Sequence, residues 1–401
     1  MPVIPLPGCG WQASEILIMR RVRAKSRISL SSHTTKKTRV LLLTASMGEG
    51  HNTAARNIRD AILADCPEGA EVLVADPYTR TNPIVNRLVQ SGYTMAINRY
   101  PRAWKVVFEL LSRRGVVEGM GPMLAELTTA VRSLVQEFRP HVIASTYPVF
   151  SFLNAKIRRS NPAMKIPFFT VITDSTQINS AWYRCPCDGS IVADEHTADV
   201  LRGDGVPEQK IHVLGFPVGL KFENLKPLAA SQPWKVLFFP GGTSARAIST
   251  LQLLGSLNNV SVDVVTGRRK ATYDAIAAAN MPKKGTLTGW TDQMPELMGT
   301  HHLFIGKAGG ATVQEAIAAQ IPFLVSHIVP GQEEGNIAFI EQMGIGALAA
   351  GSPEYVLHRV AGAFANGGNV WQAWRKNLET MQKPSASRAI AQFLLDRALK
   401  S

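Results

Sequence analysis

The sequence predicts an α/β fold with two doubly wound domains, in each of which helices cover both faces of a parallel sheet. Three observations lead to this expectation. The chain has 401 residues, more than one hydrophobic core normally serves, and this length fits two domains of about 150–200 residues. Short apolar runs, typical of strands buried on both faces, alternate with helical patterns. The alternation pauses near residue 215, in a stretch containing glycine and proline, and then starts again.

The first domain is expected to span residues 39–215. Its strands are predicted at 39–44, 71–76, 141–145, 167–173 and 189–193. A glycine turn follows the first strand and leads into a helix predicted over 52–63. Residues 1–38 are rich in Lys and Arg and lack the apolar core of a secretory signal. We expect a basic, disordered extension there; a transit segment and a mis-assigned start remain open.

The second domain is expected to span residues 216–384, followed by a helical segment, 385–401, that could pack on either domain. The predicted strands are at 235–240, 260–266, 285–287, 303–305 and 322–326. Open parallel sheets bind ligands at the carboxyl ends of their strands. We therefore expect the two domains to face each other across a cleft that holds the functional residues.

Composition narrows the classes of function. The apolar fraction of 45% indicates a globular protein, and no apolar run reaches the ~18–20 residues that span a bilayer. The net charge of +13 suits nucleic acid, an anionic membrane or a phosphorylated substrate. Nucleic acid is not expected, because no zinc-finger spacing, helix-turn-helix or RNA-binding sheet motif is present. The four cysteines lack the spacing of a metal site or a disulfide scaffold, so no metal is expected.

A glycine turn in the second half predicts a phosphate site. The apolar run 302–305 reads as a buried strand, and a helix is predicted to begin near Thr312. A helix start offers free backbone N–H groups and the positive end of a dipole to an anion. Gly309 and Gly310 remove the side chains that would hold a phosphate away from those groups.

Side chains that suit sugar hydroxyls lie close to this turn in the sequence. Glu315, one turn into the helix, carries an acceptor-only carboxylate when ionised. After the next strand, 321–328, comes a polar cluster of Gln332, Glu333 and Asn336. Phosphate donors beside hydroxyl acceptors predict a nucleotide-sugar site, which points to glycosyl transfer.

The segment 78–114 mixes aromatic and basic residues. Trp104, Lys105 and Phe108 stand among arginines, and apolar residues recur at helical spacing. This composition is typical of a helix at a membrane surface. A core helix with a solvated basic face fits equally well, so composition leaves both readings open.

Four motifs in order now carry a family resemblance. Residues 44–55, with Gly48, Gly50 and His51, form a glycine-histidine loop after the first strand; residues 100–108 contain Pro-x-x-Trp-Lys; Thr173-Asp174 is followed by Trp182; and 306–336 ends in Pro-Gly-Gln-Glu-x-Gly-Asn. Over about residues 39–380 the chain resembles the diacylglycerol glycosyltransferases of glycosyltransferase family 28. These include monogalactosyldiacylglycerol synthases and processive diacylglycerol glucosyltransferases.

The resemblance implies the two-domain GT-B fold and a reaction that needs no metal or other cofactor. UDP-glucose or UDP-galactose would bind the C-terminal domain and diacylglycerol the N-terminal one. Glu315 would hold the ribose, and the backbone of Gly309, Gly310, Ala311 and Thr312 the diphosphate. The remaining donor contacts would come from Gln332, Glu333 and Asn336 at the sugar, Trp290 and Thr291 at the uracil, and the loop of Gly242 and Thr243.

The same resemblance predicts the chemistry. His51, with an ordinary pKa near 6.5, is expected to act as the general base, exposed at the mouth of the glycine turn. Asp174 would orient His51 or bind the acceptor. Inversion at the sugar would then give a β-glycosyl diacylglycerol, made by a peripheral enzyme on the cytoplasmic face of a membrane. Gly48, Gly50, Trp182 and the segment around Trp104 would face the acceptor and the anionic membrane surface.

Some positions depart from the family pattern. Asn179 stands where the family has histidine, and Gly219 where many relatives have arginine, with Lys221 as a nearby cation. Two positions are open for the Arg246 side chain: contact with a phosphate, or exposure to solvent. Rival functions are transfer to an undecaprenyl-linked peptidoglycan precursor, transfer to another lipid or metabolite, and nonenzymatic binding of a nucleotide-sugar. The sequence leaves open the donor sugar, processivity and oligomeric state.

Overall fold

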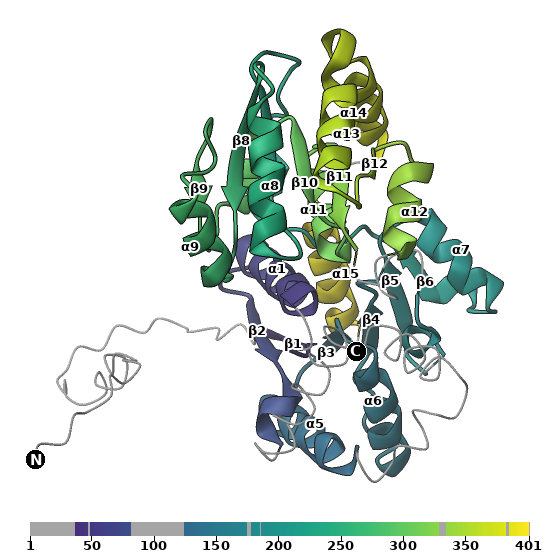
Figure 1. Ribbon diagram of the computed structural model, residues 1–401. Coiled ribbons are helices and arrows are strands. Elements are labelled where there is room, and N and C mark those ends of the chain that lie inside the picture. The colour runs from purple at the N-terminus through teal and green to yellow at the C-terminus, as the bar shows by residue number, and fades with distance from the viewer. Residues whose placement is uncertain are drawn as a thin grey trace, which may run out of the picture. The chain divides into compact units, whose positions relative to one another are not determined.

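The computed structural model describes residues 37–400 except 47–48, 82–123, 175–177, 185, 329–333 and 382–384. Residues 37–401 form one compact unit with two parallel sheets (Figure 1). The predicted basic extension lies almost wholly outside the described residues, as does most of the segment 78–114. The predicted fold class, two doubly wound α/β halves, is confirmed.

The first sheet has six parallel strands in the order β2-β1-β3-β4-β5-β6. They are β1 (Thr38–Leu43), β2 (Ala70–Ala75), β3 (Val142–Ser145), β4 (Phe168–Val171), β5 (Gly189–Val192) and β6 (Ile211–Val213). The connecting helices are α1 (Glu49–Asp65), η1 (Pro77–Arg80), α5 (Ala125–Phe138), α6 (Val149–Ser160), η2 (Ser180–Trp182), α7 (Glu195–Gly203) and η3 (Glu208–Lys210). The interior strand β1 is buried from Val40 to Leu43, because helices cover both of its faces.

The second sheet repeats this plan in the order β12-β11-β10-β7-β8-β9. Its strands are β7 (Trp234–Phe238), β8 (Val260–Val265), β9 (Leu287–Thr288), β10 (Leu303–Lys307), β11 (Phe323–His327) and β12 (Gly346–Leu348). Its helices are η4 (Leu220–Asn224), α8 (Ser244–Gly255), α9 (Lys270–Ala278), α10 (Met294–Gly299), α11 (Gly310–Ala318), α12 (Glu334–Gln342), α13 (Pro353–Phe364), η5 (Ala365–Gly367) and α14 (Asn369–Met381). All the strands predicted from sequence are present, while the three-residue strands β6 and β12 were not predicted.

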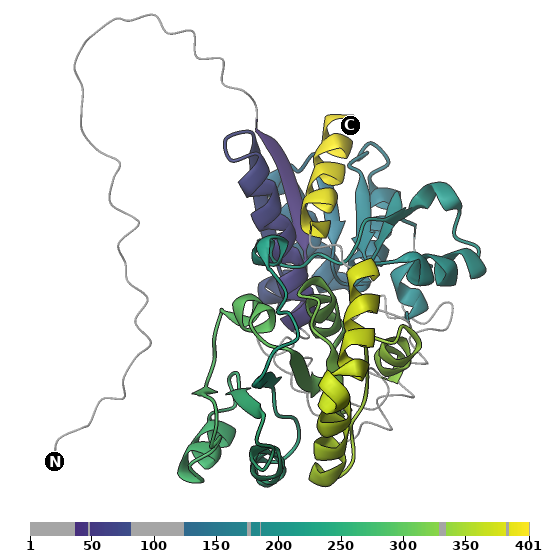
Figure 2. The same ribbon diagram turned by 90° about the horizontal axis from the view of Figure 1, so that it is seen from above.

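The last helix, α15 (Ala386–Leu399), packs on the first sheet (Figure 2). Ile390 and Leu394 share a hydrophobic core with Val40 and Leu42 of β1. The guanidinium of Arg388 forms a salt bridge of 2.9 Å with the carboxylate of Glu223 and a second one with Asp65 at the end of α1. The chain therefore crosses to the second sheet and returns, which settles the open question of where the last helix packs.

Candidate active site

His51 lies in the first turn of α1, which begins at Glu49, three residues earlier than predicted. Its side chain is half-buried, between the exposed position expected from the sequence and a core position. Helical backbone places the ring against the carboxyl ends of the neighbouring strands. The hydroxyl of Thr146, just after β3, donates to the His51 carbonyl at 3.0 Å and fixes this turn.

Three neighbouring residues hold the His51 ring. Its Nδ1 shares a hydrogen bond of 2.8 Å with the hydroxyl of Thr173, which follows β4. Tyr147 meets the ring edge-on at 5.2 Å between centroids, and Trp182 lies at 6.0 Å. Of these partners, Tyr147 was not predicted from the sequence. Its position just after a predicted strand could have identified it as a site residue.

Asp174 lies beside His51 and is fixed by a tryptophan. The indole Nε1 of Trp182 donates to Asp174 Oδ2 at 2.6 Å. Trp182 is only 1% exposed and packs in the core of the first sheet, so it cannot offer a surface to an acceptor or membrane as predicted. It instead positions the carboxylate. Asn179, where the family has histidine, caps the short helix η2 by accepting from Ala181 N.

The electrostatics of this pair favour a neutral histidine. Burial lowers the pKa of His51 below its usual value, and the Asp174 charge and the Thr146 backbone oppose that shift. Burial raises the pKa of Asp174, opposed by the charge of His51 and by the hydrogen bond from Trp182. A neutral imidazole near pH 7 can accept a proton, and the adjacent carboxylate stabilises the imidazolium that forms.

The predicted phosphate turn ends in a helix N-terminus. α11 begins at Gly310, two residues before the predicted start, with Gly309 as its N-cap. Among the described residues no side chain caps this helix, so no described capping residue satisfies the first N–H groups of α11. Ala311 and Thr312, in the first turn, are half-buried. Glycine has a low helix propensity, which is why the sequence predicted a later start for this helix.

The two helix N-termini meet. A Cβ atom built on Gly50 would lie 3.6 Å from Cβ of Ala311. Gly50 directly precedes His51, so the candidate base stands beside the candidate phosphate site. Residues about 260 positions apart in the sequence are thus brought together at the carboxyl ends of both sheets.

Glu315, on the second turn of α11, is half-buried and its carboxylate has no partner among the described residues. Burial raises its pKa to about 7. Asn336, expected at the sugar, is 4% exposed and donates to Ala308 O at 2.8 Å, so it supports the loop ahead of α11. Gln332 and Glu333 lie outside the described residues.

Trp290 follows β9 and is 63% exposed, which leaves its indole free to stack on a planar ligand. The hydroxyl of the adjacent Thr291 accepts from Gln293 N at 3.0 Å and shapes the turn. Both residues follow the carboxyl end of β9, at the edge of the second sheet, and their role in binding a base stays a prediction.

Gly242 and Thr243 form the turn between β7 and α8. Gly242 has a φ of +71°, and Thr243 caps α8 by accepting from Arg246 N at 3.3 Å. The sequence analysis did not single out His327, which packs against this turn. A Cβ atom built on the neighbouring Gly241 would lie 2.5 Å from the Cβ atom of His327. The imidazole therefore explains why a glycine precedes the turn.

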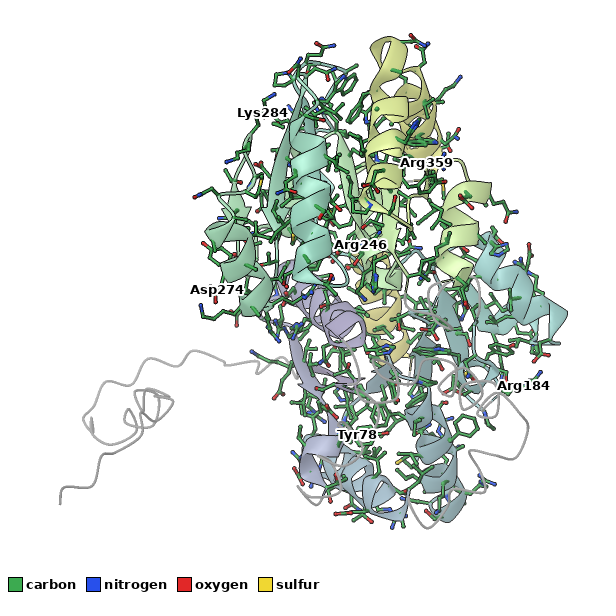
Figure 3. The ribbon with its side chains drawn as sticks, viewed as in Figure 1. Tyr78, Arg184, Arg246, Asp274, Lys284 and Arg359 are labelled. Carbon is green, nitrogen blue, oxygen red and sulfur yellow. The ribbon has the colours of Figure 1, made fainter. Side chains whose placement is uncertain are left out.

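Two arginines donate to backbone carbonyls in this region, and Arg269 donates to the turn itself. The guanidinium of Arg246, the residue labelled beside α8 in Figure 3, donates to the carbonyls of Ser326, at 3.3 Å, and of Gly351. Arg269 donates to Pro240 O at 2.6 Å and to Gly242 O. The described contacts of the Arg246 guanidinium are thus to backbone carbonyls, and its contact with a phosphate stays a prediction. Lys221, considered as a substitute cation, pairs with Glu296 at 2.8 Å.

Other predicted residues fall outside the described ranges. These are Gly48, Trp104, Lys105 and Phe108, in addition to Gln332 and Glu333. Within the described ranges, no group of three or more His, Cys, Asp or Glu side chains could hold a metal ion. No helix in that part of the chain is long and apolar enough to cross a membrane.

The two six-stranded parallel sheets, each covered by helices, have the architecture of the GT-B fold. Solved structures share this fold, although their sequences are distant. MurG of Acinetobacter baumannii matches with a TM-score of 0.58 and 15% identity, covering 90% of this chain and 100% of that one. Medicago truncatula UGT71G1, complexed with UDP-glucose, matches with a TM-score of 0.58 and 12% identity, over 91% and 99% of the two chains.

The sequence comparisons are more specific. The family model for monogalactosyldiacylglycerol (MGDG) synthase matches residues 51–218. Monogalactosyldiacylglycerol synthase 2 of Arabidopsis thaliana is 24% identical over 385 residues, covering 90% of this chain and 80% of the relative. The processive diacylglycerol beta-glucosyltransferase of Bacillus subtilis is 25% identical over 375 residues, covering 89% and 94%. The resemblance predicted from the motifs is confirmed.

Proposed function

We propose that this protein transfers glucose or galactose from a UDP-sugar to diacylglycerol and forms a β-glycosyl diacylglycerol. The main observation in support is that the His51–Asp174 pair lies beside the N-terminus of α11, where Gly50 faces Ala311. A base for the acceptor and a site for the donor phosphates are then neighbours. The names of the relatives, synthases of galactosyl and glucosyl diacylglycerol, support this choice of acceptor.

The donor would lie along the carboxyl end of the second sheet. Its diphosphate would bind the backbone N–H groups of Gly310 and Ala311 at the start of α11. Glu315 would accept hydrogen bonds from the ribose, and Trp290 would stack on the uracil. Gln332 and Glu333 would hold the hydroxyls of the sugar, which leaves the choice between glucose and galactose to them.

The chemistry is a single displacement. His51 takes the proton from the free hydroxyl of diacylglycerol while that oxygen attacks the anomeric carbon of the sugar. The bond from the anomeric carbon to the UDP oxygen breaks, and its electron pair leaves with UDP. Attack from the side opposite the leaving group inverts the anomeric centre and gives the β-glycoside. Asp174 stabilises the imidazolium that His51 becomes.

Helix N–H groups would stabilise the departing diphosphate, so the proposed mechanism uses no metal ion or other cofactor. An assay in excess EDTA checks this point, and unchanged turnover is the expected result. The enzyme would act as a peripheral protein on the cytoplasmic face of an anionic membrane. Residues 100–108 would provide part of that contact, because aromatic and basic side chains combine there.

The deciding experiment offers UDP-glucose and UDP-galactose separately to the protein with diacylglycerol, and identifies the lipid product. We expect one glycosyl diacylglycerol, with a β linkage visible by NMR. His51→Ala should lower kcat about 100- to 10,000-fold while the Kd for UDP stays near the wild-type value. Wild-type turnover in that variant would refute the assignment of the base.

The rival functions give different results in the same assay. Transfer to an undecaprenyl-linked precursor or another lipid, with diacylglycerol unused, would replace the proposed acceptor. Binding of a UDP-sugar without transfer to any lipid extract would indicate a nonenzymatic nucleotide-sugar-binding protein.

A further inference from the structure

A hollow of about 440 Å³ opens at the amino-terminal edge of the first sheet, opposite the edge that carries His51. Residues just ahead of β4, β5 and β6 form one side, and the end of α15 forms the other. Nothing in the proposed reaction uses this place. Its volume falls within the range of small-molecule sites, about 300–1,000 Å³.

Positive charge gathers in this hollow. Lys165, Arg397 and Lys400 all line it, and none of them has a carboxylate partner in the part of the chain that the structure describes. The carboxylate in its wall, Asp188, is already used: it accepts from Arg158 and from Phe168 N, both at 2.7 Å. The dipole of α15 favours cations in its last turn, which accounts for Arg397. It does not account for Lys165, which lies in the loop before β4.

Aromatic rings hold the floor of the hollow in place. The guanidinium of Arg397 lies 4.8 Å above the ring of Phe393. The centroid of the His212 ring lies 4.5 Å from that of Phe393 and 6.3 Å from that of Phe169. Gly189 makes room for this imidazole, because a Cβ atom there would lie 2.7 Å from His212 Nε2. Arg397 is therefore held in position before any ligand arrives.

We propose that this hollow binds a small, soluble anion that carries a phosphate group. Lys165, Arg397 and Lys400 would surround the phosphate, with the guanidinium offering paired N–H donors. A soluble anion fits better than a lipid headgroup, because the hollow lies at the sheet edge away from the proposed acceptor. The bound anion would link the end of α15 to the strand edge and so stabilise the docking of that helix.

The test measures binding of inorganic phosphate and of glycerol 3-phosphate to the full chain by calorimetry, at ionic strength held constant with chloride. We expect saturable binding and a rise in Tm. Lys165→Gln with Lys400→Gln should weaken binding at least tenfold; both side chains are exposed, so the variant should fold. The matched control is Lys226→Gln with Lys376→Gln, which removes two exposed charges elsewhere and should bind as the wild type does.

Two outcomes would overturn the proposal. Absence of saturable binding is one; equal affinity in the wild type and the hollow variant is the other, since the phosphate would then bind elsewhere, for instance at α11. Sedimentation with phosphatidylcholine vesicles containing phosphatidylglycerol separates the lipid source. We expect the hollow and control variants to sediment alike; loss in the hollow variant alone, without binding of soluble phosphate, would assign the site to a headgroup.

Discussion

His51 acquires the properties of a base from the residues around it. Thr173 fixes one ring nitrogen, Tyr147 and Trp182 enclose the ring, and burial lowers its pKa. Motifs alone named His51, Asp174 and Trp182. They could not show that Trp182 serves Asp174 from inside the core, since side-chain burial depends on how distant segments pack.

The pH dependence of turnover should report on this pair. Because burial lowers the pKa of His51, we expect the acid limb of kcat/KM to have its midpoint below about 6.5. Asp174 raises that pKa, so Asp174→Asn should move the midpoint to still lower pH and reduce the plateau rate. Asn keeps an oxygen for the Trp182 hydrogen bond. A midpoint that stayed fixed or rose would show that the two groups are not coupled.

Glu315 should make donor binding depend on pH. Burial raises its pKa to about 7, so the carboxylate is ionised above that pH and becomes protonated below it. We expect the KM for UDP-sugar to rise as pH falls through about 7, since the neutral acid is a weaker acceptor. Glu315→Gln should raise this KM roughly tenfold, in line with the loss of one charged hydrogen bond, and should remove the pH step. The same step in the Gln variant would point to another group.

At the scale of elements, the site depends on where α1 and α11 begin. The sequence predicted both helices and nearly all strands, because apolar periodicity marks them directly. Both helices nevertheless start two or three residues earlier than predicted, within glycine-containing turns. Glycine disfavours a helix by its own propensity, and here the tertiary contact between the two helices overrides that preference.

Gly50 tests that contact between helices. A single methyl group there would lie 3.6 Å from Ala311, which is an ordinary contact. Gly50→Ala should therefore keep activity and stabilise α1 by about 0.5–1 kcal/mol, visible as a higher Tm. Gly50→Leu should push α11 away and raise the KM for the donor. Equal donor KM in the two variants would mean that α1 and α11 are not in contact in solution.

At the scale of the whole molecule, α15 ties the end of the chain to the first sheet. The sequence left its docking open, because an amphipathic helix does not name the surface it will cover. Leu394 is fully buried against β1, whereas Leu399, the last residue of the helix, is 77% exposed. The helix thus offers a core position and a matched surface position of the same residue type.

These two leucines make the role of α15 measurable. Leu394→Ala should lower the free energy of unfolding by about 2–5 kcal/mol, through lost burial and the cavity left behind. Leu399→Ala should change it by less than about 0.5 kcal/mol. Urea unfolding of both variants gives the comparison. Similar values for the two would mean that α15 is not docked on the first sheet in solution.

The return of α15 also sets an order of events during synthesis. The ribosome produces the six strands of the first sheet well before Ile390 and Leu394, yet those residues complete its core. Until they emerge, apolar side chains of α1 and β1 have no cover on that side. The first half of the chain therefore waits through translation of the entire second sheet before it can close its own core.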